Sequence, residues 1–393
     1  DMHGGQSFPF FDSDMAPYME GRSEDEVYQA MEALVFNLNS MHSRAGAQVP
    51  FSSLNLGCDI SQGGRLASKC LLEAYEAGLG RGETPIFPNI IFRVKAGVNA
   101  RPGDPNYDLF LLACQVAARR MNPTFSFMDS SFNAPYGSEV SYMGCRTRVI
   151  ANRHGAAVSA GRGNLSFTSV NLPRLAIQAG GSEDRFVSLL GHCMDLAARQ
   201  LLHRYDVQSR LRVRDMPFLM GQHIYMASEE LSADDEIAPA IKHGTLSIGF
   251  IGLAEALTIL RGGCHGQAIG IAASDEADAL GYEIVEFMRK RVDEYADAHD
   301  LNFTLLATPA EGLSGRFVAI DRERFGTISG VTDRAYYTNS FHVPVGARIS
   351  ICDKLAREGK YHGLSNAGHI SYVELASPPL HNVEAVESIV RAM

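Results

Sequence analysis

The sequence predicts an α/β fold, in which strands and helices alternate along most of the chain. Short runs rich in β-branched and aromatic residues recur between segments whose apolar residues follow helical spacing. No repeat or low-complexity segment interrupts this alternation, and no stretch has the composition of a domain linker. Such alternation is typical of α/β proteins. Length alone suggests two or three domains, although one large barrel would accommodate all 393 residues.

The first third of the chain gives these elements one by one. Residues 3–17 are rich in Gly, Pro and aromatics and predict a loop or short strand. Ser23 and Glu26 fit a capping box, and the apolar residues that follow have helical spacing, which predicts a helix to Met41. The next predicted elements are a strand at 51–57, a helix to Leu79, a strand at 85–95, a helix from Asp104 and a strand at 124–128.

The rest of the chain continues the pattern. Gly249 and Gly252 lie in or just after a strand-like run and would allow a neighbouring backbone to approach closely. The predicted strands are 164–173, 246–253, 302–307, 340–343 and 369–375. The predicted helices are 184–205, 208–216, 254–260, 276–297 (with most of its charge on one face) and 383–390.

Composition excludes several classes of protein. The net charge of −10 argues against binding to a nucleic-acid backbone, although one pocket for a nucleotide can still be locally positive. No signal peptide or membrane-length apolar run is visible, so we expect a cytoplasmic protein without a membrane partner. The seven cysteines include no CxxC pair, so we expect no structural disulfides and no zinc site.

One cysteine has a setting that suggests chemistry. Cys145 lies between a glycine and an Arg-Thr-Arg run, after a turn-like segment at 133–138 and before a loop rich in Gly and Asn. Cationic neighbours at a loop tip favour thiolate and sulfur chemistry. The alternative is that Cys145 is a small buried apolar residue, as single cysteines commonly are.

The segment around Cys145 resembles the finger loop of class III (anaerobic) ribonucleotide reductases. The similarity rests on 143–149 followed by 164–175 and extends over almost the whole chain. Further similar motifs are His3-Gly-Gly-Gln-Ser7, 102–110, 243–255, 307–316, 337–343 and 366–375. The resemblance implies a ten-stranded α/β barrel of two half-sheets with the finger loop at its centre. The chain is expected to be an internal fragment, so residues 1–393 would form one catalytic barrel domain, incomplete at both ends.

The resemblance also implies a function, the reduction of ribonucleoside triphosphates to deoxyribonucleoside triphosphates. Cys145 would form the thiyl radical that abstracts the 3′ hydrogen of the ribose. Asn171, or less favourably Asn164, would bond a ribose hydroxyl; the alternative for either amide is that it only caps a turn.

Residues 308–315 have the makeup of a phosphate cradle, because a strand ends there and small residues leave backbone N–H groups free. We expect the phosphates here and the ribose directed toward Cys145. Arg316 is close in sequence for charge pairing, and Glu311 would be a polar group of the site rather than a phosphate ligand. The candidate substrate-binding residues of this segment are Thr308, Glu311, Gly312, Ser314 and Gly315.

Cofactors and partners follow from the resemblance alone. It implies nucleotide effectors, a homodimer, and an iron–sulfur/S-adenosylmethionine (radical-SAM) activating protein that installs a glycyl radical. The family's glycyl-radical loop and its zinc-binding Cys pairs are absent from these residues, as are the N-terminal ATP cone and the upstream segment with a second active-site cysteine. We expect no cofactor within this chain, and the reductant, formate or a thioredoxin-like dithiol, is left open.

Two other functions remain open at this point. Cys145 could be the nucleophile of a hydrolase, with His154 or His342 as its base, although no orienting third residue is apparent. The chain could instead be a non-catalytic nucleotide-binding fragment. His342 and His369 lie in strand-like runs and are expected to be core histidines, and a catalytic role for Cys58 is not expected.

Overall fold

The computed structural model describes residues 5–42, 46–261, 270–380 and 382–393. The chain forms two compact units. The first unit comprises Met2–Cys145, Val158–Ala160 and Leu375–Met393, and the second comprises Arg146–Ala157 and Gly161–Glu374. The division along the chain therefore falls directly after Cys145. That both units belong to one catalytic barrel domain stays a prediction.

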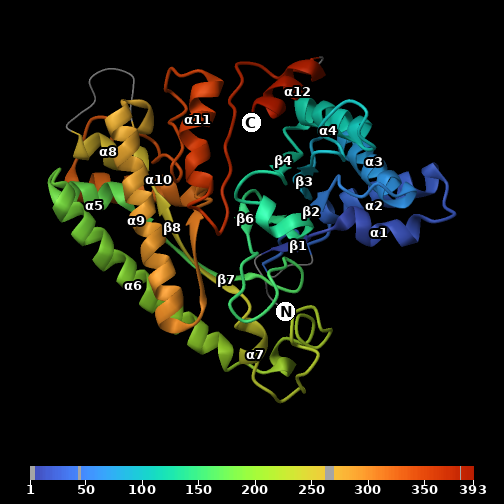
Figure 1. The fold of residues 1–393 in the computed structure, drawn as a ribbon, viewed down its shortest axis with the longest axis horizontal. Coiled ribbons are helices and arrows are strands. Elements are labelled where there is room, and N and C mark those ends of the chain that lie inside the picture. Colours follow the sequence, from blue (N-terminus) through green and yellow to red (C-terminus); the bar gives the residue numbers. More distant parts are fainter. Residues whose placement is uncertain (1–4, 43–45, 262–269, 381) are drawn as a thin grey trace. The chain divides into compact units, whose positions relative to one another are not determined.

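The first unit is built on a parallel sheet in the order β1-β2-β3-β4. The strands are β1 (Gln6–Phe8), β2 (Ser52–Leu56), β3 (Asn89–Val94) and β4 (Thr124–Phe127). The helices are α1 (Phe11–Met19), α2 (Glu24–Ser40), α3 (Gln62–Ala77), α4 (Tyr107–Arg120) and α12 (Val383–Ala392), with a 3-10 helix η1 (Ala134–Glu139). Figure 1 shows this unit in blue and cyan, with α12 in red beside α4.

Alternation along the strands decides which face of this sheet meets the helices. Leu54 and Leu56 of β2 and Phe92 of β3 are almost fully buried in one apolar cluster with residues of α2, α3 and α4. Ser53 and Asn55 occupy the alternate positions of β2 and are equally buried. The side of the sheet toward the helices is thus apolar, and the opposite side of β2 is polar.

The second unit is built on a second parallel sheet, in the order β7-β8-β9. Its strands are β7 (Asn164–Asn171), β8 (Thr245–Ile251) and β9 (Asn302–Ala307), and a short strand β6 (Thr147–Arg148) precedes them. Its helices are α5 (Leu172–Ala179), α6 (Glu183–Ser209), α7 (Ala238–Ile241), α8 (Leu253–Leu260), α9 (Asp275–His299), α10 (Glu311–Phe325) and α11 (Ile351–His362), with 3-10 helices η2 (Val213–Asp215) and η3 (Gly270–Ala272).

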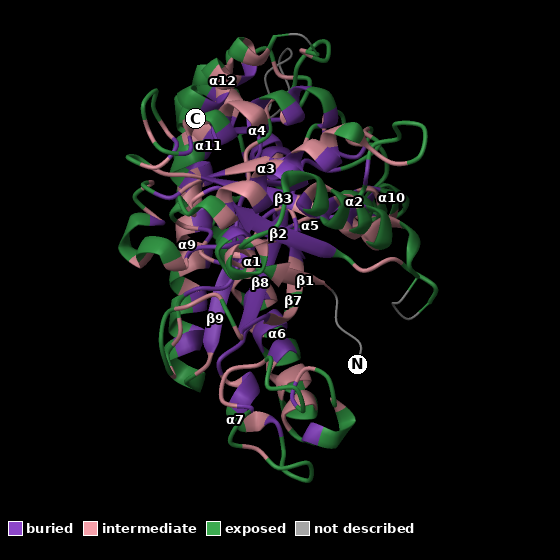
Figure 2. Ribbon diagram, turned by 90° about the vertical axis from the view of Figure 1, so that its right-hand side faces the viewer, coloured by how far each residue is buried: buried purple, intermediate pink, exposed green. Residues whose placement is uncertain are grey.

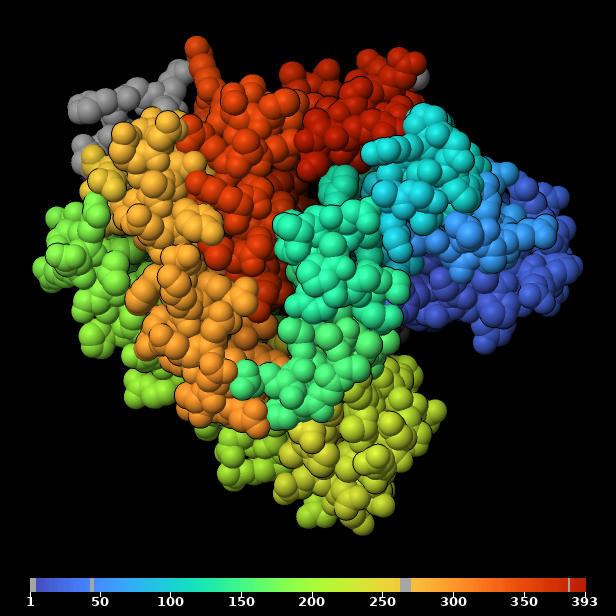
Figure 3. Space-filling model, in the orientation of Figure 1, coloured from blue at the N-terminus to red at the C-terminus, as the bar shows by residue number. Residues whose placement is uncertain are grey.

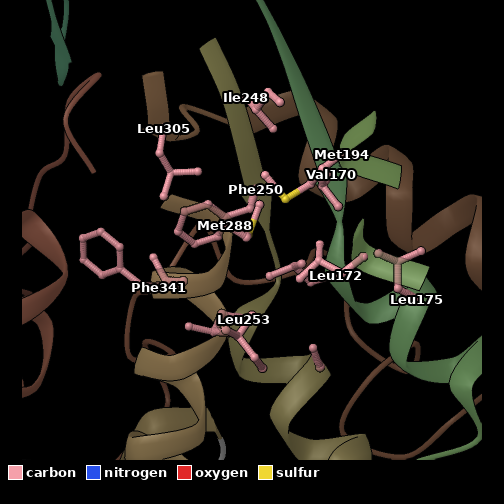
Figure 4. Close-up of a cluster of buried hydrophobic side chains, with 14 of the residues drawn as sticks. Val170, Leu172, Leu175, Met194, Ile248, Phe250, Leu253, Met288, Leu305 and Phe341 are labelled. Atoms are coloured by element: carbon pink, nitrogen blue, oxygen red, sulfur yellow. The ribbon is translucent and has the colours of Figure 1, made fainter. Parts of the chain in front are cut away.

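The core of the second unit lies between this sheet and two long helices. Helices α6 and α9 run along the same face of the sheet, and strands β8 and β9 are buried almost throughout (Figures 1 and 2). Phe250 and Leu305 point from the strands toward Met288 of α9 (Figure 4). The charged residues of α9 lie on its outer face, as predicted, and that face reaches the surface in orange in Figure 3.

Most predicted elements are confirmed. The capping box at Ser23 is present: its Oγ accepts from the Glu26 backbone N–H at 3.3 Å and the Glu26 carboxylate accepts from the Ser23 N–H at 2.9 Å. The predicted close approach of a backbone at Gly249 and Gly252 was wrong, because side chains pack there instead: a Cβ on Gly249 would lie 2.0 Å from Thr308 Oγ1. A Cβ on Gly252 would lie 2.4 Å from Pro173 Cγ. The close neighbours are side chains rather than backbone.

Four predictions of local structure were wrong. Residues 340–343 and 369–375 are irregular rather than strands; Phe341 and Val343 are apolar because they fill the core of the second unit. Residues 208–216 form no second helix, since α6 continues to Ser209 and only the 3-10 turn η2 follows. Within 3–17, β1 is followed by helix α1, which tolerates Pro17 near its end.

Candidate active site

Cys145 lies in a turn between β5 (Tyr142–Met143) and β6. It is a half-buried free thiol, as expected for a residue at a loop tip. The preceding Gly144 has φ +59°, in the left-handed region that favours glycine. A Cβ on Gly144 would lie 3.0 Å from Phe51 Cε1, so a side chain at this position would press on that ring. Glycine is therefore required immediately before the cysteine.

Polar side chains of β1 and β2 bond the backbone that leads to Cys145. Asn55 Oδ1 accepts from the Tyr142 N–H, and Asn55 Nδ2 donates to the Tyr142 carbonyl, both at 2.9 Å. Ser7 Oγ donates to the same carbonyl at 2.9 Å. The Gly144 N–H donates to Ser53 Oγ at 2.7 Å. Three consecutive peptide groups, from 141–142 to 143–144, are thus bonded by side chains of β1 and β2 on the approach to the cysteine.

The residue after Cys145 is anchored within the second unit. Arg146 is fully buried, and its guanidinium donates to the carbonyls of Ala307 and Thr308 at 3.4 and 3.2 Å and to the Tyr372 hydroxyl at 2.7 Å. A Glu311 carboxylate oxygen lies 4.0 Å from Arg146 Nη2. The Arg146 side chain therefore marks the carboxyl end of β9, where the predicted phosphate cradle begins.

Helix α10 starts inside the predicted cradle. Ala310 is its N-cap and offers no side-chain cap, so the first N–H groups depend on other acceptors. Gly312 lies in the first turn next to open space, with no atom within 4 Å of the position of a Cβ. The Glu311 side chain is 73% exposed. An uncapped helix start facing open space has the positive dipole end and free donors that favour an anion.

The other cradle residues support the start of this helix. Thr308 is fully buried, and its hydroxyl lies 2.9 Å from Ser169 Oγ of β7. Ser314 is buried, and its hydroxyl donates to the Glu311 carbonyl at 3.3 Å. Gly315 lies near the Ala335 carbonyl, and Arg316 is exposed. Thr308 and Ser314 are therefore buried and bonded within the protein, whereas Gly312 is exposed.

Asn171 ends β7, and both ends of its amide have partners. Its Oδ1 caps α5 by accepting from the Arg174 N–H at 3.0 Å, and its Nδ2 donates to Asp321 Oδ2 of α10 at 2.7 Å. Asp321 is fully buried and also accepts from Arg174 Nε at 2.6 Å and from the Tyr337 hydroxyl at 3.0 Å. Burial and the nearby Asp321 carboxylate raise the pKa of Tyr337, which stays a neutral donor.

The geometry favours Asn171 over Asn164 as a site residue. Because β7, β8 and β9 are parallel, the end of β7 and the start of α10 share the carboxyl edge of the sheet, where α/β proteins bind ligands. Asn164 lies at the opposite end of β7, roughly 20 Å away by strand rise. Its Nδ2 donates to Thr245 Oγ1 at 3.0 Å and also to Ser247 Oγ.

The remaining candidate residues have structural surroundings. His342 and His369 are both buried, and burial lowers the pKa of each, as expected for core histidines. His154 is paired through Nε2 with the Asp300 carbonyl at 2.8 Å. Cys58 has its Sγ 3.5 Å from the Arg93 carbonyl, and burial raises the pKa of its thiol. His3 lies outside the described residues.

Sequence patterns alone missed the residues that hold these groups. Asn55 and Ser53 were visible only as polar members of an alternating strand, and Arg146 only as a cationic neighbour of the cysteine. Asp321 gave no signal, because its partners lie far away in sequence.

Among the residues that the structure describes, no group of three or more His, Cys, Asp or Glu side chains is arranged to hold a metal ion. Among the helices of the described ranges, none has the length and apolar character to cross a membrane.

A family model described as anaerobic ribonucleoside-triphosphate reductase matches residues 1–393. The reductase of that name from Salmonella typhimurium is 36% identical over 381 residues, covering 96% of this chain and 52% of the relative. Its counterpart from Enterobacteria phage T4 is 34% identical over 388 residues, covering 96% and 61%. The chain thus spans about half the length of the bacterial relatives it matches.

Solved structures agree at the level of the fold. A structure described as anaerobic ribonucleotide reductase superposes with a TM-score of 0.72 at 14% identity, covering 99% of this chain and 60% of that one. The Thermotoga maritima enzyme in complex with dATP and CTP gives a TM-score of 0.69 at 16% identity, covering 99% and 65%. The two parallel sheets are consistent with a partial barrel of that fold.

Proposed function

Because the chain belongs to the anaerobic ribonucleoside-triphosphate reductase family, we propose that it contributes the ribose-reducing site of such an enzyme. Cys145 is the residue that acts on the substrate, and the product is a deoxyribonucleoside triphosphate for DNA synthesis. The observation that carries this proposal is the fixed turn at Cys145, which holds a free thiol on a bonded backbone within a chain that matches the family throughout.

The chemistry assigned to Cys145 is hydrogen-atom transfer. The thiol loses its hydrogen atom and becomes a thiyl radical, which then takes the 3′ hydrogen of the ribose and re-forms the S–H bond. The C2′–O bond breaks as the protonated 2′ hydroxyl leaves as water. An external reductant supplies two electrons and a proton completes the new C2′–H bond, while formate is oxidised to carbon dioxide or a dithiol to a disulfide. Return of the hydrogen atom from Cys145 to C3′ restores the thiyl radical. These reaction steps require a cysteine in a fixed position and a site that excludes water.

Substrate binding is assigned to the carboxyl edge of the second sheet. The uncapped start of α10, around Gly312, would bind the phosphates through backbone N–H groups. The amide of Asn171 would contact a ribose hydroxyl with the donor and acceptor capacity left beyond its two observed bonds. Glu311 is placed as a polar group beside Arg146, and its negative charge makes it unsuitable as a phosphate ligand.

Further components belong to the proposal rather than to this chain. A glycyl radical would supply the hydrogen-atom acceptor for Cys145, and the half-buried free thiol fits that role. We assign that radical, and a structural zinc, to sequence outside these 393 residues, with a radical-SAM protein as the activator. Nucleotide effectors are included because a relative of this fold has been solved with dATP and CTP. We further propose a homodimer in the cytoplasm.

The test is an anaerobic assay of the full reading frame with its activating protein. Each ribonucleoside triphosphate is supplied with formate or with a dithiol, and products are separated by chromatography. We expect deoxyribonucleoside triphosphate with one of the two reductants, and none when the activating protein is omitted. Binding without turnover under both conditions would favour the non-catalytic reading, and release of inorganic phosphate would favour a hydrolase.

A further inference from the structure

Side chains that project from β1 and β2 bond the backbone of the segment that leads to Cys145. Strand β2 is central in its sheet, so its own backbone groups pair with β1 and β3. A segment crossing the face of that sheet can only be bonded by side chains that project from it. The Asn55 amide accepts a hydrogen bond from the Tyr142 N–H and donates one to the Tyr142 carbonyl, both at 2.9 Å. These two hydrogen bonds resemble the pair that two opposed residues exchange in an antiparallel sheet.

Asn55 is fully buried, and its contacts account for its amide completely. Besides Tyr142, its Nδ2 lies 3.2 Å from Ser7 Oγ and 3.2 Å from the Phe8 carbonyl. A buried amide without partners is strongly unfavourable, so an apolar residue would suit this position if packing alone mattered. The side chain is therefore explained by the backbone that it holds.

Ser53 adds a second point of attachment two residues further along the chain. Its Oγ is fully buried and accepts from the Gly144 N–H at 2.7 Å. Gly144 is also confined by its positive φ and by the Phe51 ring. The two attachments lie on the peptide groups of Tyr142 and Gly144, so the chain reaches Cys145 in one orientation.

We propose that Asn55 and Ser53 are positioning residues for Cys145, which they act on through the backbone of residues 142–144. This inference rests on the proposed function for its effect on turnover, and on the hydrogen bonds alone for its effect on the thiol. Hydrogen transfer needs the sulfur near contact distance, and a displacement of about 1 Å can lower a rate by roughly 10²-fold. A loosened turn would therefore lower kcat while leaving substrate affinity in place.

Ser53→Ala is the first test, with Ser52→Ala as its matched control. Ser52 is the neighbouring buried serine of β2, and its Oγ has no hydrogen-bond partner in the described parts of the chain. In the full-length protein, Ser53→Ala should lower kcat about tenfold, the change expected from one lost hydrogen bond, with KM within twofold. In Ser53→Ala, iodoacetamide should alkylate Cys145 several-fold faster than in wild type, as measured by mass spectrometry. Ser52→Ala should match wild type in all three.

Asn55→Asp adds a readout that a purely structural role would not produce. A protonated carboxyl has one donor and one acceptor and can replace the amide, whereas a carboxylate repels the Tyr142 carbonyl. The kcat of Asn55→Asp should therefore recover as pH falls, relative to wild type at each pH. Asn55→Ala, which cannot be protonated, should show no such recovery. If Asn55→Ala does not fold, Ser53→Ala and Asn55→Asp still decide the question.

The outcomes separate this inference from the proposed function. Equal alkylation rates in Ser53→Ala and Ser52→Ala would overturn the inference whatever the enzyme does. Faster alkylation with an unchanged kcat would also overturn it, because the hold would then have no catalytic effect. If Cys145→Ser retained turnover, the proposed function would fail, and the alkylation comparison would still judge whether Ser53 holds the cysteine.

Discussion

The two parallel sheets are alike on the side that packs against helices, where both are apolar. They differ in what the polar side chains on their opposite sides bond. Leucines of β2 and the residues Ile248 and Phe250 of β8 are buried against helices in both units. On the opposite side of the first sheet, side chains bond the main chain of residues 142–144. On the opposite side of the second sheet, polar side chains bond one another, as Ser247 and Thr304 do at 2.9 Å.

This difference indicates a division of work between the sheets. Side chains that bond a passing backbone immobilise it, and the segment held in this way carries the thiol. Side chains that satisfy one another need no further partner, and the N-terminus of α10 beside them keeps its N–H groups uncapped. We infer that the first sheet serves a reactive group of the protein itself, and that the second leaves room for a ligand.

The largest test of this comparison is Cys145→Ser in the full-length protein. Serine preserves size and polarity, but its O–H bond is too strong to yield a hydrogen atom to the same chemistry. Nucleotide reduction should fall by roughly 10³-fold or more, while nucleotide affinity stays near wild type. Cys58→Ser is the matched control and should keep its activity, because that thiol faces the Arg93 carbonyl. Comparable turnover in Cys145→Ser would remove the thiyl assignment.

Asp321→Asn tests the second sheet, where one buried carboxylate joins α10 to the end of β7. The change removes the charge that accepts from Asn171, Arg174 and Tyr337. The free energy of unfolding in urea should fall by about 1–3 kcal/mol, and KM for the ribonucleotide should rise. As a control, Asp293→Asn breaks an exposed pair with Arg289 and should change stability by less than about 0.5 kcal/mol. An unchanged KM would separate Asn171 from substrate binding.

A third test concerns acid, which should destabilise the second unit through its buried histidines. Burial lowers the pKa of His362 to about 4 from an ordinary value of 6.5, and its ring stacks on His369 at 4.1 Å. Between these values the unfolded state binds more protons, so stability rises with pH and is lost as pH falls. The contribution is ~1.4 kcal/mol for each pH unit in that window.

His362→Phe keeps the ring and removes the titration. Compared with wild type, its melting temperature should fall less steeply between pH 6.5 and 4. Comparison of the two slopes cancels groups that titrate in both proteins, including Glu255, whose pKa is raised by burial. Parallel curves would show that His362 does not titrate in this range.

The smallest expected effect is at the start of α10. Gly312→Asp adds a negative charge where phosphate is proposed to bind, and Gly312→Ala adds only a methyl group into open space. The aspartate variant should bind ribonucleoside triphosphate about two- to fivefold more weakly than the alanine variant, corresponding to ~0.3–1 kcal/mol at a helix terminus. Both should melt near or above wild type, because glycine is unfavourable within a helix. Equal affinities in a titration would remove the phosphate site.

Sequence patterns predicted those parts of the fold that rest on local periodicity. The capping box at Ser23 and the strand at 302–307 depend on neighbouring residues, and both are confirmed. The irregular segment around Phe341 was predicted as a strand, because burial in the core produces the same apolar composition. Hydrophobicity records burial, and only pairing partners elsewhere in the chain decide whether a buried segment is a strand.

The candidate site divides in the same way. Cys145 and the segment 308–315 stand out because glycine, small residues and charge cluster locally. Asn55 and Asp321 do not stand out in the sequence. The partner of Asn55 is 87 positions away, and one partner of Asp321 is 150 positions away. Motifs thus identified the groups expected to react or bind, and the structure supplied those that hold them in place.

The Asn55 amide and the Ser53 hydroxyl, which bond the backbone before Cys145, also have an evolutionary consequence. Main-chain bonds survive almost any substitution, but these attachments are made by side chains, and a point mutation can remove any one of them. Selection on the thiol should then extend to Asn55 and Ser53, although neither is expected to meet the substrate. Among natural variants, threonine should be the tolerated replacement at position 53, because it keeps the hydroxyl. Natural variants that lack both the Asn55 amide and the Ser53 hydroxyl should come from genes no longer under selection for activity.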